Sequence, residues 1–400
     1  MRRRGFLVSV LGCASAVAGP MAAAQAVAPT QGPGARRPSG ASIARADVGE
    51  GLSRAVVGAS WRGPRDGDPH HAGALEVEWA RKAVRILWSA ELPTRPHGLT
   101  PEPDGGLLVV GVRPGTWIAR YDGQGRMVCR VRVDEEPGRA RLNGHAVASA
   151  DGRWLFTTET DPKAGRGRIG VRDRETLAKL DEWDSLGIEP HQLLLDADGQ
   201  VVIANGGIPR TEGDRKHSLD RMDASLARLD GRTGRPTGHW RLDDPRLSLR
   251  HLSWSAGPDS AMARLGVALQ AEHDDPERRR VAPVLAVFEG ERLTLPASAG
   301  DAVGYAGDIA PAADGGFVVS SNQVGRALLW HPGRPERLTT IAQLREAYAL
   351  AGWDGPHRAG GVLVASAFGV ARWHPEATPA MAAWPEPMTL DNHWVLLSAS

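Results

Sequence analysis

The chain has 400 residues, 42% of them hydrophobic and 24% charged, and its 48 basic and 47 acidic residues give a formal net charge of +1. The arginines are scattered rather than gathered into a stripe, so the composition argues against a nucleic-acid-binding protein. Beyond the first residues, no apolar stretch approaches the roughly 18 residues that cross a membrane. We therefore expect a mature chain without a membrane span.

Residues 1–28 have the three-part form of an export signal. The arginines Arg2–Arg4 precede a modest apolar run, and small residues offer cleavage points after Ala24 and Ala28. Within this segment the order Arg-Arg-Gly-Phe-Leu fits a twin-arginine signal, which predicts export to the periplasm in the folded state. An ordinary Sec signal is the alternative. Removal of the segment leaves 45 basic against 47 acidic residues and Cys129 as the only cysteine, so no internal disulfide can form.

The next segment, residues 29–52, is rich in Ala, Gly, Pro and Arg and has almost no large apolar side chains. Such a composition cannot bury enough apolar surface to offset the entropy lost on ordering, which predicts a flexible linker. Residues 53–400 are then expected to form one domain, because no second linker follows. A domain of this length exceeds the usual single core, and a repeat architecture removes that conflict.

A repeated pattern runs through this domain. An apolar stretch, an Asp-Gly pair and a second apolar stretch recur, with the Asp-Gly pairs at residues 104–105, 151–152, 198–199 and 314–315. Glycine supplies the positive φ that a tight turn between antiparallel strands needs. Two more short strands follow each hairpin, and the units recur at about 46 to 60 residues, which is typical of four-stranded propeller blades.

The two ends of the domain complete the repeat. The N-terminal part offers only three strands, at residues 54–60, 74–80 and 84–92, and the C-terminal strand at 393–398 has no partner after it. Joining them completes a four-stranded unit and leaves no open sheet edge. The sequence therefore predicts an all-β, seven-bladed β-propeller with four antiparallel strands per blade, closed into a ring by the C-terminal strand. An irregular pair of β-sandwiches is the alternative.

The innermost strands of six predicted blades begin with polar side chains, five with a histidine and one with an aspartate. Equivalent positions of successive blades lie at similar height around one axis. We therefore expect these side chains to converge on the mouth of the central channel. The six residues are His97, His145, His191, His251, His393 and Asp308.

A spacing of 14 residues links three of these strands to a second polar residue on the following strand. Because the turn lies midway, the two residues of each pair are expected side by side on adjacent antiparallel strands. The pairs are His145 with Glu159, His191 with Asn205, and Asp308 with Asn322.

This face of the predicted propeller offers a metal site. Neutral imidazole is a good ligand for a divalent metal such as iron, copper or zinc, and we interpret the five histidines as candidate metal ligands, of which three or four could reach one ion. Polar residues on the same face are candidates for binding a small ligand or cofactor in the channel mouth. These residues are Arg113, Glu159, Asn205, Arg250, Asp308 and Asn322.

Three other interpretations of the same residues stay open. The histidines can be structural, each forming a hydrogen bond to the neighbouring blade. They can belong to a metal-dependent enzyme in which Glu159 acts as acid or base. The protein can also be a scaffold that binds only other proteins.

Several short motifs within residues 95–330 resemble one family. Among them are Arg113-Pro114-Gly115-Thr116, Gly144-His145, Thr157-Thr158-Glu159, Pro190-His191, Ala204-Asn205-Gly206-Gly207 and Leu249-Arg250-His251-Leu252. Through these motifs the chain is similar to the exported bacterial β-propeller family catalogued as domain of unknown function fifteen-thirteen. The segment Tyr305–Asp308 departs from the family pattern.

The resemblance implies a function as well as a fold. Genes of this family often neighbour those of imelysin-type iron-uptake proteins, which implies a periplasmic binding or accessory protein that works beside periplasmic iron-uptake proteins. Separately, we expect the protein to be a monomer. The resemblance assigns no reaction. We therefore expect a protein that holds a metal, a metal chelate or a partner protein on the histidine face.

Overall fold

The structure is a computed structural model that describes residues 54–255, 263–297, 300–353 and 361–399. The predicted export signal and linker, residues 1–52, lie outside the described residues. The described residues form 28 β-strands and four short helices. None of these helices is long and apolar enough to cross a membrane. The helices are α1 (Pro276–Val281) and the 3-10 helices η1 (Val133–Glu135), η2 (Leu219–Arg221) and η3 (Ala313–Gly315).

Five sheets have four strands each, and neighbouring strands within them are antiparallel. In each sheet the strands follow chain order, as the repeated hairpins predict. The first two are β4 (Pro96–Pro101), β5 (Leu107–Gly111), β6 (Trp117–Tyr121), β7 (Met127–Arg132), and β8 (Arg141–Ala148), β9 (Trp154–Thr160), β10 (Gly167–Asp173), β11 (Lys179–Asp184). The other three are β12 (Pro190–Leu195), β13 (Val201–Asn205), β14 (Ser225–Leu229), β15 (Pro236–Trp240); β16 (Leu247–Trp254), β17 (Leu265–Ala271), β18 (Leu285–Glu289), β19 (Arg292–Thr294); and β20 (Asp308–Pro311), β21 (Phe317–Ser321), β22 (Arg326–Trp330), β23 (Leu338–Gln343).

The sixth sheet has eight strands and contains both ends of the described chain. Its strand order is β24-β25-β26-β27-β3-β2-β1-β28, and β28 runs antiparallel to β1. Strands β27 and β3 meet at a single parallel pair, Ala383 with Ala83. The strands are β24 (Leu350–Trp353), β25 (Gly361–Ser366), β26 (Gly369–His374), β27 (Ala377–Ala383), β1 (Arg54–Arg62), β2 (His70–Glu78), β3 (Ala83–Glu91) and β28 (Thr389–Ala399).

Aromatic and cationic side chains hold the two halves of this sheet together. The guanidinium carbon of Arg372 lies 5.0 Å from the ring centroid of Trp79 and 5.4 Å from that of Trp353. The two indole rings themselves are 5.9 Å apart. A cation over two aromatic faces stabilises this boundary where backbone pairing is limited to one residue pair.

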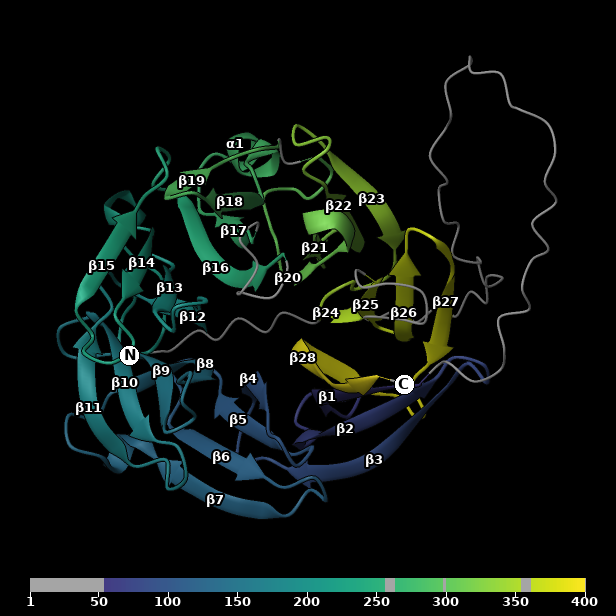
Figure 1. Ribbon diagram of the computed structural model, residues 1–400, viewed down its shortest axis with the longest axis horizontal. Helices are drawn as coiled ribbons and strands as arrows, with labels where there is room; N and C mark the ends of the chain where they lie inside the picture. The colour runs from purple at the N-terminus through teal and green to yellow at the C-terminus, as the bar shows by residue number, and fades with distance from the viewer. Residues whose placement is uncertain (1–53, 256–262, 298–299, 354–360, 400) are drawn as a thin grey trace, which may run out of the picture.

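The sheets are arranged around a common axis, so the described chain has an all-β propeller fold (Figure 1). Strands β4, β8, β12, β16, β20, β24 and β28 lie nearest the axis, and each contacts the next in this order. Strand β28 contacts both β24 and β4. Side chains at equivalent positions of the inner strands can therefore meet at the axis.

The core lies between the faces of neighbouring sheets. Leu107 and Val109 of β5, for example, pack in one cluster with Val395 of β28. Phe156 of β9 packs with Ile203 of β13. Burying one such side chain contributes roughly 1.5–3 kcal/mol, so these contacts fix the sheets relative to one another.

The Asp-Gly turns adopt the predicted backbone. The glycines at positions 105, 152, 199 and 315 have φ values of 80°, 70°, 74° and 78°. This left-handed region favours glycine because a Cβ would clash there. The expectation of positive φ at these four hairpins is confirmed.

Candidate functional site

Five histidine side chains meet where the inner strands face one another. They come from five different inner strands, and each is at most 8% exposed. The ring centroids of His97 and His145 are 4.8 Å apart, and those of His251 and His393 are 4.3 Å apart. His191 lies 4.6 Å from His251 by the same measure. The structure thus brings together all five histidines singled out in the sequence, and we call them the histidine cluster.

Each histidine of the cluster lies in a β-bulge. On β4 the pairing moves from Pro96 opposite Gly111 to Leu99 opposite Val109, so that two residues, including His97, face one partner. Similar register shifts interrupt pairing at His145, His191, His251 and His393. A bulge bends its strand and re-aims a side chain. Strands β20 and β24 pair with their neighbours without a shift and contribute no histidine to the cluster.

A glycine in one bulge allows the histidines to pack closely. Gly144 has a φ of 110°, and a Cβ at this position would lie 2.4 Å from Cδ2 of His97. We expect Gly144→Ala to destabilise the protein by about 1–3 kcal/mol, because it adds both backbone strain and a clash with the imidazole. Gly138→Ala is the matched control, since Gly138 also has a positive φ, 85°, but a Cβ added there would meet no atom within 4 Å. Urea unfolding measures both, and equal stability losses would contradict a special role for Gly144.

The ring nitrogens of the cluster form a candidate metal centre. One nitrogen each from His97, His145, His251 and His393 lies within 4.8 Å of every other. His191 stands beside them, with its Nε2 2.9 Å from Nε2 of His251. Both ring nitrogens of His97, and Nε2 of His145 and of His393, are buried without a hydrogen-bond partner in the described structure. Burying such atoms without partners costs free energy, and the four histidines could hold a metal ion that satisfies them.

Burial keeps most of the cluster neutral. It is the main cause that lowers the pKa of His97, His145, His191 and His251 well below the usual value of 6.5. The charges of the other histidines, and of nearby arginines, lower these pKa values further. The neutral form is the one whose lone pair binds a metal.

Asp308 orients His393. Its Oδ1 lies 3.3 Å from Nδ1 of His393 and accepts a hydrogen bond from the backbone of Ile309, while Oδ2 accepts one from the backbone of Leu350 at 2.8 Å. A proton on Nδ1 facing the carboxylate leaves Nε2 of His393 with a free lone pair. Carboxylates hold metal-binding histidines in this way. The structure therefore places Asp308 at the cluster, as a residue that contacts a histidine.

Arg113 and Arg250 lie beside the cluster and share one carboxylate. Nη1 of each is 2.9 Å from Oε1 of Glu189, and Nε of Arg210 is 2.8 Å from the same atom. Burial by itself would raise the pKa of Glu189, but the charges of Arg250, Arg113 and Arg210 outweigh it and lower the pKa to about 2. Nε of Arg113 also donates to Asp214 at 2.8 Å. We call these five residues the arginine cluster.

Sequence reasoning missed the centre of the arginine cluster. Glu189 stands two residues before His191, just ahead of an inner strand, and this position is the signal that could have identified it. Arg210 is in the long segment after β13 and reaches Glu189 only in the folded chain.

The register predicted from the 14-residue spacing is wrong. Strand β9 places Glu159 opposite Leu142, strand β13 places Asn205 opposite Pro190, and Asp308 lies opposite Ser320. In the first two cases the bulge adds residues to the histidine strand and moves the histidine out of the pair. In the third case the pairing has no bulge, and Asp308 pairs with Ser320, which is closer to it in sequence than the predicted partner Asn322.

Glu159 does not fit the role of acid or base at the cluster. Its carboxylate is fully buried and lies 2.8 Å from Nη2 of Arg172 and 2.8 Å from Nζ of Lys179. Thr157 donates a third hydrogen bond at 2.7 Å. Burial alone would raise the pKa of Glu159, but the two cations outweigh it and lower the pKa. These contacts make Glu159 a structural group within its own sheet, which argues against the catalytic interpretation.

Asn205 is also held by structural contacts. Its Nδ2 donates to the carbonyl of Ser185 at 2.9 Å and to the hydroxyl of Ser225 at 3.3 Å. The side chain is fully buried. These contacts are with structural neighbours rather than with the histidine cluster.

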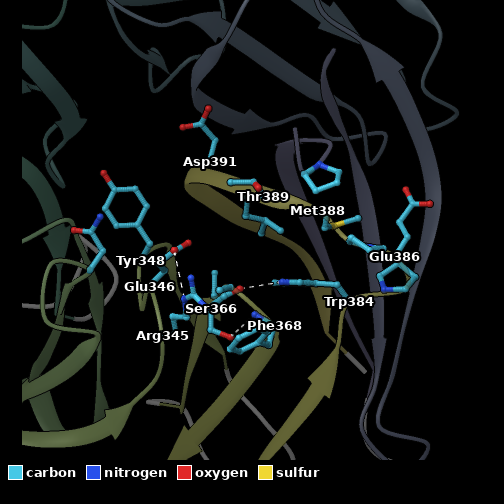
Figure 2. Close-up of a pocket in the computed structure, with 17 residues that line it drawn as sticks. Arg345, Glu346, Tyr348, Ser366, Phe368, Trp384, Glu386, Met388, Thr389 and Asp391 are labelled. Atoms are coloured by element: carbon cyan, nitrogen blue, oxygen red, sulfur yellow. Dashed lines mark hydrogen bonds and ion pairs between the residues drawn. The ribbon is translucent and has the colours of Figure 1, made fainter. Parts of the chain in front are cut away.

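Asn322 lines a separate cavity of about 720 Å³. Figure 2 shows Tyr348, Trp384 and Asp391 around this cavity. Asp391 lies on β28, two residues before His393, so the cavity and the histidine cluster share a strand. No histidine of the cluster lines the cavity, so the structure separates Asn322 from the cluster.

Solved structures of similar fold have little sequence identity with the chain. A hypothetical selenium-binding protein from Sulfolobus tokodaii has a TM-score of 0.57 and 11% identity, covering 88% of this chain and 94% of its own. The hydrazine synthase of Kuenenia stuttgartiensis has a TM-score of 0.55 and 14% identity, covering 80% and 95%. A catalytically inactive virginiamycin B lyase from Staphylococcus aureus has a TM-score of 0.51 and 12% identity, covering 78% and 96%. At these identities the likeness concerns the fold alone.

No curated protein sequence matches the chain. The family described as protein of unknown function (DUF1513), in contrast, matches residues 90–397. The matched range covers most of the chain and includes all five histidines of the cluster, which confirms the resemblance seen in the short motifs. The chain therefore belongs to the DUF1513 family.

Proposed function

We propose that the protein binds one divalent transition-metal ion through the histidine cluster and acts as a binding or accessory protein. The observation that carries this proposal is the convergence of four buried imidazole nitrogens from four inner strands. Packing contacts between blades do not require such a group. Burying a polar nitrogen without a hydrogen-bond partner costs free energy, which a bound ion would offset.

The donor set fits such an ion. A nitrogen ligand lies about 2.0–2.1 Å from zinc, which puts the ligand atoms roughly 3.3–4.2 Å from one another. The four nitrogens lie within 4.8 Å of one another, so they need to move by only a fraction of an ångström. Imidazole ligands favour iron, copper, nickel or zinc over magnesium and calcium. Among these we propose iron, because the family resemblance implies genes that neighbour those of iron-uptake proteins.

The same proposal includes the complete architecture and its location. We propose that the eight-stranded sheet counts as two blades divided at the pair Ala383–Ala83, which makes seven four-stranded blades. Strand β28 would then close the ring as the inner strand of the first blade and supply His393. Residues 1–28 would direct the protein to the periplasm, where iron-uptake proteins are its proposed partners.

Metal binding can be measured with Co²⁺, because its visible spectrum reports nitrogen coordination. We expect metal-free protein to bind one Co²⁺ per chain. The double variant His145→Gln/His393→Gln removes two of the four ligands and should weaken binding at least about 100-fold. Asp308→Asn should weaken it by roughly 10- to 100-fold, because the amide orients His393 less well. Isothermal titration with Co²⁺, Zn²⁺ and Cu²⁺ gives the stoichiometry and the affinity.

His374→Gln is the matched control for these variants. His374 is also a buried histidine, but it lies on β26 and is not among the grouped ligands. Its replacement should leave Co²⁺ affinity unchanged. The proposal fails if the unaltered protein binds none of the three ions, or if the double variant binds them as tightly as the unaltered protein does.

A further inference from the structure

We propose that the metal site also takes a small anion, an inorganic oxyanion or a carboxylate, as the ligand that completes the coordination of the ion, with Arg250 and Arg113 holding that anion. This inference rests on the proposed metal site and names the class of its exchangeable ligand. The observation behind the inference is that the arginine cluster lies next to the imidazoles of the histidine cluster, which are neutral and do not offset the charge of a bound ion.

The first step is the charge of the site. Four imidazoles bind a divalent ion without neutralising it. Among residues 54–255, 263–297, 300–353 and 361–399, the carboxylates in contact with the two clusters are Asp308, Glu189 and Asp214. The ion and the three guanidiniums of the arginine cluster outnumber them by two charges. Uncompensated charge in a buried site is costly, so a bound anion is strongly favoured there.

The second step is the placement of Arg250. It precedes His251 in the same bulge, and its side chain is buried. Glu189 fixes Nη1 at 2.9 Å, and Gln270 lies 3.3 Å from Nε. Within the described residues, Nη2 has no hydrogen-bond partner. Arg250 is thus a rigid cation with one donor group left for a ligand.

The third step is the closeness of both arginines to the metal ligands. Arg250 directly precedes His251 in the bulge of β16, and both side chains are buried. Glu189, which holds Nη1 of Arg250 and of Arg113 at 2.9 Å, is two residues before His191. Nε2 of His191 is in turn 2.9 Å from Nε2 of His251. The shared carboxylate therefore holds both cations at the strands that carry the histidines, where they can stabilise an anion bound to the ion.

Azide added to the Co²⁺-loaded protein tests the proposal, because the visible spectrum of Co²⁺ changes when an anion enters its coordination sphere. We expect a saturable spectral change at constant Co²⁺ content. Arg250→Gln should raise the azide dissociation constant about tenfold, the effect of losing one nearby charge, and Arg250→Lys should recover part of the loss. Arg113→Gln is the second variant and should also raise the azide dissociation constant. It keeps the test possible if the Arg250 variants do not fold.

Arg264→Gln is the matched control. Arg264 is a partly buried arginine paired with Glu289 at 2.9 Å, outside both clusters, and its loss should leave azide binding unchanged. The anion proposal is overturned if Co²⁺ binds but azide leaves its spectrum unchanged. It is also overturned if the variants at Arg250 and Arg113 bind azide as tightly as the control does. Failure of Co²⁺ to bind at all would instead reject the metal site, and the anion site with it.

Discussion

Glu189→Gln is expected to destabilise the protein by about 5 kcal/mol, enough to prevent recovery of soluble folded protein or to lower the melting temperature by about 10 °C or more. Glu189 is 4% exposed and is the shared partner of Arg113, Arg210 and Arg250. Removing one partner of a buried ion pair leaves the other charge uncompensated. Here a single neutral substitution leaves three guanidiniums around an amide.

Glu346→Gln is a close control for this prediction. Both glutamates have left-handed backbone, with φ values of 54° for Glu189 and 56° for Glu346, so the backbone context of the substitution is the same. The carboxylate of Glu346 is 57% exposed and lies 3.9 Å from Arg345, and exposed pairs of this kind contribute little. Thermal unfolding should therefore show a change of less than about 1 kcal/mol for Glu346→Gln. Equal melting temperatures for the two variants would show that the arginine cluster does not stabilise the fold.

The sequence predicts the blade pattern and the histidines because both repeat. Asp-Gly turns at a regular spacing reveal the hairpins, and their glycines have the expected positive φ. The histidines recur on the inner strands of different blades, so the symmetry of a propeller is sufficient to bring them to one axis, although His145, His251 and His393 lie within their strands rather than at the start. The pairing of the C-terminal strand with β1 is also predictable, because the strands at the two ends of the domain complete a four-stranded unit only when they are combined.

What the sequence does not predict is the local geometry that distinguishes structural from functional polar groups. A bulge is one or two extra residues in a strand and leaves no reliable pattern, so a 14-residue spacing gives the wrong partner for Glu159. The ion pairs of Glu159 with Arg172 and Lys179 depend on side-chain directions within one sheet. Those of Glu189 with Arg113 and Arg250 join segments more than 60 residues apart, which only the folded chain brings together.

Acid should unfold the metal-free protein over a narrow range below pH 6.5. Burial lowers the pKa of His97, His145, His191 and His251 well below 6.5, whereas in the unfolded chain these groups return to about that value. Above pH 6.5 both states are neutral at these positions and the full stability is present. As the pH falls below 6.5, the unfolded state takes up protons that the folded state does not, so stability is lost until the folded pKa values are reached.

The size of this effect follows from the number of histidines. Each one contributes a loss of about 1.4 kcal/mol per pH unit, so four together give roughly 5 kcal/mol per pH unit. The stability of a typical domain is about 5–15 kcal/mol, and most of it would be gone within one or two pH units. Glu189 does not weaken over the same range, because its pKa is about 2. A bound metal should shift the transition to lower pH, because protons then compete with the ion for the imidazole lone pairs.

The slope of unfolding free energy against pH is the quantity that checks this prediction, since it counts the protons taken up on unfolding. Between pH 6 and pH 5 we expect a slope near four protons for the metal-free protein and near two for His97→Gln/His145→Gln. His217→Gln, at an exposed position outside the histidine cluster, should keep the slope of the unaltered protein. If the double variant and the unaltered protein have the same slope, the buried imidazoles are not held neutral, and the cluster does not present the free lone pairs that a metal site requires.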